Sequence, residues 1–358
     1  MNSDFTDDNG IENNLLNGDY NQIKDGTENP LRPKKLADFQ GQDAIKSNLS
    51  IFIQAANDRS ESLDHVFLSG PPGLGKTTLA GIIANELGAE LKVTSAPAIE
   101  KPKDLAGILT GITERCVFFI DEIHRLKPAI EEMLYIAMED YEMDWVIGQG
   151  PSARNIRIPI PQFTLIGATT KAGAVASPLY SRFGISCRMD FYRAEDIMSI
   201  IRRSAGILDI SIDEDAVVQL AGCSRGTPRV ANRLLRRMRD FAHVENSGII
   251  TKDIVMNGLK RLEIDAMGLE RLDRQILRLI IERYDGGPVG AETLAISAGE
   301  AVESLEDFYE PYMIQQGFIK RTPRGRMVTD LAYSHLGLTP GAQRKAGGNT
   351  DENQSLLF

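Results

Sequence analysis

The stretch GPPGLGKT at residues 70–77 constrains the fold more than any other part of the chain. It fits the pattern G-x-x-x-x-G-K-[ST], and it stands between an apolar run (HVFLS, 65–69) and a segment of helical period (KTTLAGIIANEL, 76–87). In that setting glycines let backbone N–H groups surround phosphates, the lysine reaches the outer phosphates and the threonine hydroxyl holds Mg²⁺. We therefore predict a nucleotide-binding loop. Its contact residues are Gly73, Gly75, Lys76, Thr77 and Thr78, with Thr77 on the metal.

The apolar runs predict an α/β domain followed by two smaller ones. Runs at 91–96 (LKVTSA), 116–121 (CVFFID) and 163–168 (FTLIGA) suit strands buried on both faces of a parallel sheet. After about Tyr192 only helical patterns follow, and from about Asp265 three helices precede FIKRT, PRG and RMVT, which read as a hairpin with a turn glycine. We predict a P-loop α/β domain with a parallel sheet, a small helical lid domain and a C-terminal winged-helix domain. The domain ranges are 31–192, 193–263 and 264–338, and the tails 1–30 and 339–358 are expected to be disordered.

Two carboxylates follow the run CVFFID, at the carboxyl end of its strand, where α/β sheets place ligands. Asp121 can bind Mg²⁺ or its water shell, and Glu122 can polarise the water that attacks a γ-phosphate. An Asp-Glu pair alone could equally cap a helix. Next to a phosphate loop, hydrolysis is the better interpretation.

A sharply basic tip stands out on an acidic chain. The net charge is −10, and residues 1–30 hold seven acids against one lysine, yet KRTPRGR at 320–326 has four cations. Cations on a hairpin tip favour contact with a nucleic-acid backbone. We predict DNA contacts from Arg321, Arg324 and Arg326; the alternative is a solvated surface loop.

Other classes of site find little support in the composition. No apolar run reaches the length that a membrane-spanning helix needs, and no signal peptide is visible, so a cytoplasmic location is expected. Three scattered cysteines and four dispersed histidines predict neither a disulfide framework nor a zinc site.

Together the motifs resemble the RuvB family of AAA+ ATPases, bacterial motors that drive branch migration of Holliday junctions. Similar stretches run from about Leu31 to Gly337 and include FIDEIHRL, MEDY, GATTKAG, SPLYSRFG, RGTPRVANRLLRR and RTPRGR. The resemblance implies a homohexameric ring with ATP and Mg²⁺ held between neighbouring subunits. Tyr180 and Val302 depart from the family pattern, each standing where many or some relatives have a basic residue.

The resemblance also implies individual roles. Leu31 and Arg32 match the segment that closes over the adenine, joined around the nucleotide by Glu139, Asp140, Tyr141 and Tyr192. Thr170 matches the sensor of the γ-phosphate, Arg182 the arginine finger given to the neighbour's ATP, and Arg229 the second sensor. Catalysis would thus fall to Glu122, Thr170 and Arg182. Considered without the family context, Thr170 could be a helix cap, and Arg182 and Arg229 could form surface ion pairs.

Three partners follow from the same resemblance: duplex DNA at Holliday junctions, a RuvA-like junction-binding protein and a RuvC-like resolvase. Residues 141–161 read as two strands around Gly148 and Gly150 and resemble the hairpin that contacts RuvA. Exposed Trp145, Val146 and Ile147 would form its docking patch, although such residues are also common in cores.

The function that the resemblance implies is ATP-driven branch migration in recombination and DNA repair. An AAA+ clamp loader or another remodeller acting on DNA remains the alternative. A protein unfoldase is disfavoured because residues 96–115, between the second strand and the carboxylate strand, contain no Phe, Tyr or Trp for a pore loop.

Overall fold

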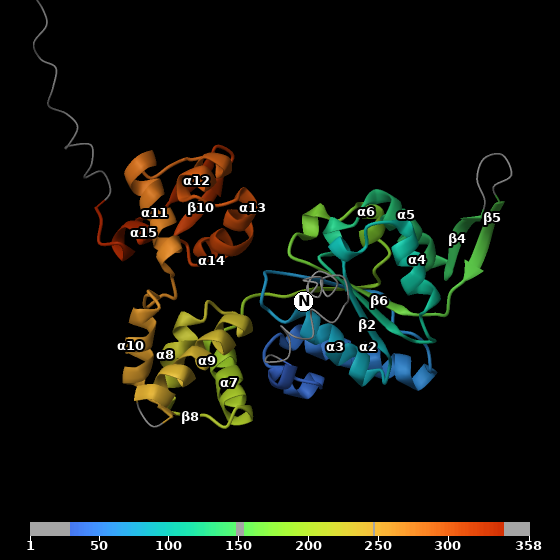
Figure 1. The fold of residues 1–358 in the computed structure, drawn as a ribbon, viewed down its shortest axis with the longest axis horizontal. Helices are drawn as coiled ribbons and strands as arrows, with labels where there is room; N and C mark the ends of the chain where they lie inside the picture. Colours follow the sequence, from blue (N-terminus) through green and yellow to red (C-terminus); the bar gives the residue numbers. More distant parts are fainter. Residues whose placement is uncertain (1–28, 148–153, 246–247, 340–358) are drawn as a thin grey trace, which may run out of the picture.

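The computed structural model describes residues 29–147, 154–245 and 248–339, which form three parts (Figure 1). A large α/β domain lies on the right in the view of Figure 1, a helical lid at the lower left and a small head above it. None of the described helices is both long enough and apolar enough to cross a membrane.

A five-stranded parallel sheet forms the centre of the large domain. Its strand order is β2-β3-β6-β1-β7, and every pair of neighbours is parallel. The strands are β1 (Val66–Ser69), β2 (Leu91–Ser95), β3 (Val117–Asp121), β6 (Thr164–Thr169) and β7 (Ile185–Arg188). The phosphate loop therefore leaves the strand next to β6, and β3 lies on the other side of β6.

Helices cover both faces of this sheet. On one face Val66 and Leu68 join a cluster with α2 (Asp43–Arg59) and α3 (Lys76–Glu86). On the other face Phe67 and Phe118 pack with α4 (Pro102–Thr110) and α5 (Pro128–Glu139). Such alternation is expected of strands buried on both sides. Short elements complete the domain: η2 (Asn29–Leu31), η3 (Leu36–Asp38), η4 (Ala96–Ala98), η5 (Ile123–Arg125), η7 (Ala172–Ala174) and α6 (Ser177–Tyr180).

A hairpin of β4 (Glu142–Ile147) and β5 (Arg154–Pro159) projects from the large domain, away from lid and head (Figure 1). It confirms the two strands predicted for 141–161. Gly148 and Gly150 lie outside the described residues.

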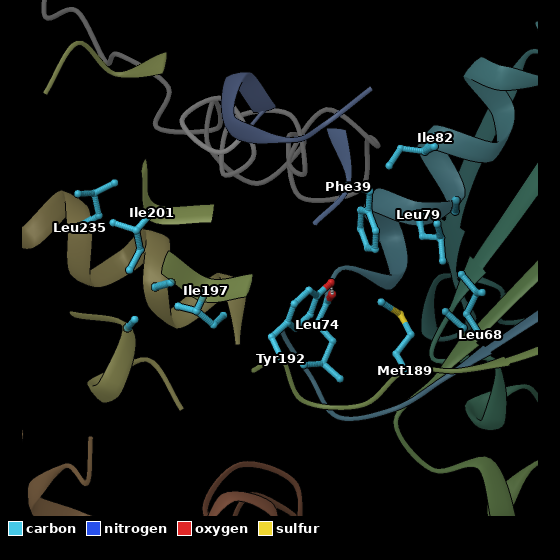
Figure 2. Close-up of a cluster of buried hydrophobic side chains, with 14 of the residues drawn as sticks. Phe39, Leu68, Leu74, Leu79, Ile82, Met189, Tyr192, Ile197, Ile201 and Leu235 are labelled. Carbon is cyan, nitrogen blue, oxygen red and sulfur yellow. Dashed lines mark hydrogen bonds between the residues drawn. The ribbon is translucent and has the colours of Figure 1, made fainter. Parts of the chain in front are cut away.

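The lid shares one buried cluster with the large domain. Figure 2 shows Phe39, Leu74 and Leu79 beside the phosphate loop, with Ile197 and Ile201 of the lid on the other side of Tyr192. The lid elements are α7 (Ala194–Ile207), β8 (Ser211–Ile212), α8 (Glu214–Cys223), α9 (Pro228–Glu245), β9 (Ile249–Ile250) and α10 (Lys252–Arg261). A change of lid position therefore disturbs packing next to the phosphate loop.

The head has its own buried cluster, which includes Ile276, Leu305 and Phe318. Its elements are α11 (Arg271–Tyr284), α12 (Ala291–Ala298), α13 (Val302–Ser304), the π-helix η8 (Leu305–Tyr309), α14 (Glu310–Gln315), β10 (Ile319–Thr322), β11 (Gly325–Val328) and α15 (Asp330–His335). The antiparallel pair β10–β11 confirms the predicted wing. Gly325, with φ of 134°, makes its turn, and an added Cβ would lie 2.3 Å from the Val289 carbonyl oxygen.

Two details of the sheet differ from the prediction. β2 is an edge strand whose Leu91 and Val93 are exposed, so its apolar run is not buried on both faces. β7 was not anticipated, since its buried and exposed residues alternate and no continuous apolar run marks it.

Candidate functional site

The phosphate loop joins β1 to α3 through a backbone that glycine makes possible. Gly70, Gly73 and Gly75 have φ of 144°, 82° and 102°, and a Cβ on Gly70 would lie 2.4 Å from the Met189 carbonyl oxygen. Larger residues would be strained at all three positions. The loop is thus shaped for the close approach of a polyphosphate.

Lys76 is the first residue of α3, and its side chain turns back over the loop. Its Nζ donates to the carbonyl oxygens of Gly70, 2.7 Å away, and Pro71, 3.0 Å away, and the residue is 7% exposed. Burial lowers the pKa of this ammonium. Because its hydrogen bonds go to neutral carbonyls, a phosphate oxygen is a stronger partner than those it has now.

A cavity of about 320 Å³ opens over this loop. Twelve of the residues predicted for the nucleotide and its metal line it: Leu31, Arg32, Gly73, Gly75, Lys76, Thr77, Thr78, Asp121, Glu122, Thr170, Tyr192 and Arg229. Sequence reasoning missed several other lining residues, among them Phe39, Arg203, Asn232 and Phe308. Asn232 lies within the stretch RGTPRVANRLLRR but was not assigned a role, and the four residues come from three different parts of the fold.

Asp121 and Thr77 supply the oxygens expected of a magnesium site. Both line the cavity, and burial raises the pKa of the Asp121 carboxyl. Magnesium is usually held by one or two carboxylates together with substrate phosphates, and keeps several waters. Within the described ranges no group of three His, Cys, Asp or Glu side chains could hold a metal alone. The residues present therefore fit a magnesium that arrives with a nucleotide.

Glu122 follows β3 with φ of 51°, a left-handed conformation that is uncommon outside glycine. Thr170 Oγ1 donates to its Oε2 at 3.3 Å, and His124 Nδ1 lies 3.2 Å from the same oxygen. One carboxylate oxygen is thus hydrogen-bonded to Thr170 and lies against the His124 ring. The sequence prediction placed Thr170 here but overlooked His124.

The lid closes the cavity from the other side. The Arg229 N–H donates to the Gly73 carbonyl oxygen at 3.3 Å, and its side chain is exposed. Tyr192 Oη donates to the Leu74 carbonyl oxygen at 2.9 Å, and Arg203 Nη1 donates to Leu31 at 2.6 Å (Figure 2 shows Tyr192 against Leu74). These hydrogen bonds connect Leu74 of the phosphate loop to Tyr192 and Leu31 to Arg203 of the lid.

Four predicted nucleotide residues do not line this cavity. Arg182 Nη2 pairs with Glu139 Oε2 at 2.7 Å, and its guanidinium lies 5.0 Å from the Tyr135 ring centre. Asp140 ends α5, and the ring of Tyr141 packs edge-on against Phe163. The expectation that Glu139, Asp140 and Tyr141 surround the nucleotide is not met within one chain. They lie together with Arg182 on a separate part of the large domain.

The predicted DNA-contact arginines have unequal surroundings. Glu310, which is fully buried, accepts from Arg321 Nε at 2.8 Å and from Arg326 Nε at 2.6 Å. The Arg326 side chain is 12% exposed and also pairs with Glu306, whereas that of Arg321 is 51% exposed. Arg324 is exposed at the turn. Arg324 and Arg321 can therefore face a ligand, while Arg326 is occupied inside the head.

Trp145 is less exposed than its sequence context suggests. It is half-buried and packs against the cluster that covers the α4–α5 face of the sheet. The side chains of Val146 and Ile147 lie outside what the structure describes, so the predicted apolar patch rests on one partly covered tryptophan.

Family models match the chain in three consecutive segments. A "Holliday junction DNA helicase RuvB P-loop domain" matches residues 31–189, a "RuvB AAA lid domain" 192–265 and a "RuvB C-terminal winged helix domain" 266–337. The "Holliday junction branch migration complex subunit RuvB" of Treponema denticola is 69% identical over 319 residues, 89% of this chain and 93% of that protein. The protein of the same name from Treponema pallidum is 65% identical over 94% of this chain and 96% of its own length.

Solved structures agree with these matches. The Thermotoga maritima RuvB Holliday junction branch migration motor has a TM-score of 0.81 at 49% identity, covering 87% of this chain and 99% of that one. The likeness thus extends over the P-loop, lid and winged-helix domains together.

Proposed function

Because the chain belongs to the RuvB family of AAA+ ATPases, we propose that it uses ATP to drive branch migration of Holliday junctions. The observation that carries the proposal is one cavity in which the phosphate loop, the Asp121–Glu122 carboxylates and Thr170 converge. Nothing in this arrangement favours the clamp-loader alternative over the activity named for the relatives.

ATP would bind with its phosphates on residues 70–77 and its base toward Leu31 and Arg32. Lys76 would exchange its carbonyl partners for phosphate oxygens, and exposed Arg229 would reach the same phosphates from the lid. Glu122, with Oε2 held by its neighbours, would accept a proton from the attacking water through Oε1. Thr77 and Asp121 would hold a magnesium ion, which would supply neutralisation of charge on the phosphates.

The second half of the site would come from a neighbouring subunit. Arg182, Glu139, Asp140 and Tyr141 lie outside their own chain's cavity but near one another, as residues that act on a neighbour's ATP would. We propose a homohexamer in which Arg182 leaves Glu139 and stabilises transition-state charge on the adjacent nucleotide. Hydrolysis then depends on assembly.

DNA would be held by the head, chiefly through phosphates, since a branch-migration motor must act on any sequence. Arg324 and Arg321 are the proposed contacts. Arg326 would hold Arg321 in place through their shared carboxylate and contribute less directly to DNA. The proposed partners are a RuvA-like junction protein at the β4–β5 hairpin and a RuvC-like resolvase, acting together in the cytoplasm.

The deciding experiment is strand exchange on a labelled synthetic four-way junction with Mg-ATP, with and without a RuvA-like partner. We expect conversion that requires ATP and the partner and is lost in Glu122→Gln and Lys76→Ala. Glu122→Gln should still bind ATP, whereas Lys76→Ala should not. ATP hydrolysis without junction conversion would contradict branch migration and direct attention to clamp loading.

The trans role of Arg182 has its own test. Arg182→Ala should not hydrolyse ATP alone, but mixing it with Lys76→Ala should restore part of the activity. In mixed rings a Lys76→Ala subunit supplies an intact Arg182 to a neighbour with an intact phosphate loop. If no mixing ratio restores hydrolysis, Arg182 does not act between subunits.

A further inference from the structure

His124 lies two residues after Glu122, within the short helix η5, and its side chain is 12% exposed. Its Nδ1 is 3.2 Å from Glu122 Oε2 and 2.9 Å from Thr169 Oγ1. Thr169 is fully buried at the end of β6, directly before the sensor Thr170. The ring thus connects the hydrolytic carboxylate to the strand that carries the sensor.

The available protons define which atom donates in this contact. An ionised Glu122 carboxylate only accepts hydrogen bonds, so a bond between Nδ1 and Oε2 needs the proton on Nδ1. Thr169 Oγ1 already accepts the Lys171 N–H at 2.9 Å and can accept Nδ1–H as well. A proton on Nδ1 is donated to the Thr169 hydroxyl, 2.9 Å away, and lies beside the Glu122 carboxylate, whose Oε2 is 3.2 Å from the same nitrogen.

Glu122 Oε2 accepts a hydrogen bond from Thr170 Oγ1 and also lies 3.2 Å from His124 Nδ1. Both neighbours therefore lie against Oε2, and within the described ranges no hydrogen bond reaches Oε1. Glu122 itself lines the nucleotide cavity, whereas His124 does not. One oxygen is thereby anchored to β6 while the other is available to a water in the cavity. The contacts of 3.2–3.3 Å are long, as hydrogen bonds of catalytic groups often are before substrate binds.

Several charged groups surround the imidazole. Glu122 and Asp307 favour its protonation, while Lys171 and Arg125 oppose it, and burial is the largest influence and lowers the pKa of His124. The neutral ring is therefore the form that lies beside Glu122 near neutral pH. A neutral ring can orient the carboxylate without neutralising its charge.

We propose that His124 is a positioning residue for ATP hydrolysis: the ring, hydrogen-bonded to Thr169 of β6, presents Nδ1 to Glu122 Oε2 and limits the movement of this carboxylate, so that Oε1 faces the attacking water. The inference rests on the proposed ATPase function and assigns no direct contact with nucleotide to His124. Movement of β6 when Thr170 meets the γ-phosphate would then reach Glu122 by two routes, through Thr170 and through Thr169 with His124. A single contact would leave the carboxylate free to rotate about that bond.

Steady-state hydrolysis by the full-length protein tests this, using His124→Ala, His124→Asn and the remote control His243→Asn. We expect His124→Ala to lower kcat by about 10- to 100-fold, the scale of loss for a misplaced catalytic group. KM and the affinity for a non-hydrolysable ATP analogue should change by less than about twofold, because His124 does not line the cavity. The Asn amide can place an N–H near the position of Nδ1, so His124→Asn should recover most of kcat. His243, exposed on α9, should tolerate the same substitution.

The results separate this inference from the proposed function. If the unaltered protein hydrolyses no ATP, or Glu122→Gln remains active, the proposed function itself is wrong. If Glu122→Gln is inactive while His124→Ala retains full kcat, only the positioning role is wrong. If His124→Ala weakens analogue binding as much as it lowers kcat, or His124→Asn recovers nothing, His124 is a structural residue of the loop and the inference is overturned.

Discussion

Replacing Arg326 with alanine should loosen the head before it weakens DNA binding directly. Arg326 Nε donates to Glu310 Oε1 at 2.6 Å, and its Nη2 contacts both Glu310 and Glu306. Glu310 is fully buried at the start of α14, and the Arg326 side chain is only 12% exposed. The substitution removes one of the two cations that compensate this buried carboxylate.

The expected loss of stability in Arg326→Ala follows from the burial of Glu310. Removing one partner of a buried ion pair costs about 3–5 kcal/mol, because the remaining charge is left without compensation. Arg321 keeps two hydrogen bonds to Glu310 Oε2, at 2.8 and 2.6 Å. We therefore expect the lower end of the range, about 3 kcal/mol, or about a 10²-fold rise in the open population of the head.

Hydrogen exchange of the full-length protein, followed on peptides that cover β10, β11 and α14, measures this opening. Protection of these amides in Arg326→Ala should fall by about 10²-fold. Arg324→Ala is the matched control, since its exposed side chain should cost under about 0.5 kcal/mol. Adding Glu310→Gln to Arg326→Ala should recover part of the protection, because the buried charge is removed.

DNA binding gives the second readout. Arg324→Ala should reduce the slope of log K against log salt by up to about 0.9 per lost phosphate contact while leaving protection intact. If Arg326→Ala instead lowers DNA affinity with unchanged protection, Arg326 contacts DNA directly and the reasoning from Glu310 fails. Equal loss of protection in Arg324→Ala would refute it as well.

Three further predictions concern the nucleotide site. Burial raises the pKa of Asp121, so the stabilising contribution of this carboxyl is present below its pKa in the unfolded chain and is lost as the pH rises through its pKa in the folded protein. Asp121→Asn should therefore raise the thermal stability of the apo protein at pH 7–8 but not near pH 3, and it should abolish magnesium-dependent hydrolysis. Equal melting temperatures of the two proteins at pH 7 would contradict this. Tyr192→Phe removes the bond to the Leu74 carbonyl oxygen and should cost about 0.5–1.5 kcal/mol in denaturant unfolding, with weaker ATP binding in calorimetry; an unchanged unfolding midpoint would argue against it. Lys171 Nζ lies 3.0 Å from Asp307, so Lys171→Glu should repel this carboxylate and weaken the contact between the head and the large domain by up to about 1 kcal/mol. A two-dye assay should then show a larger average distance between these domains. The charge-swapped pair Lys171→Glu with Asp307→Lys should restore the original distance.

Much of the fold was predictable from local patterns. The apolar runs at 65–69, 116–121 and 163–168 became β1, β3 and β6, because strands buried on both faces need apolar residues at every position. The phosphate loop was predictable since few residues other than glycine adopt its backbone. β7 was not predicted because a strand at the sheet edge with one covered face has alternating rather than continuous apolar residues.

Pairing of charges was not predictable, since it depends on which distant residues the fold brings together. Arg326 and Arg324 stand two positions apart in one basic stretch, yet one is held by buried Glu310 and the other is exposed. His124 lies within the stretch FIDEIHRL, but its contact with Thr169 bridges 45 positions and could not be read from that stretch. A sequence pattern identifies the residue types of a site, whereas burial of their partners determines which of them remain available.

The head and the nucleotide site are connected by more than the chain. Lys171, directly after the proposed sensor Thr170, pairs with Asp307, and Phe308 of the same π-helix lines the cavity. A π-helix is rare and is frequently found at functional sites. Phe308 of the head and Arg229 of the lid border the same cavity, so a nucleotide bound as proposed would lie beside both parts of the fold.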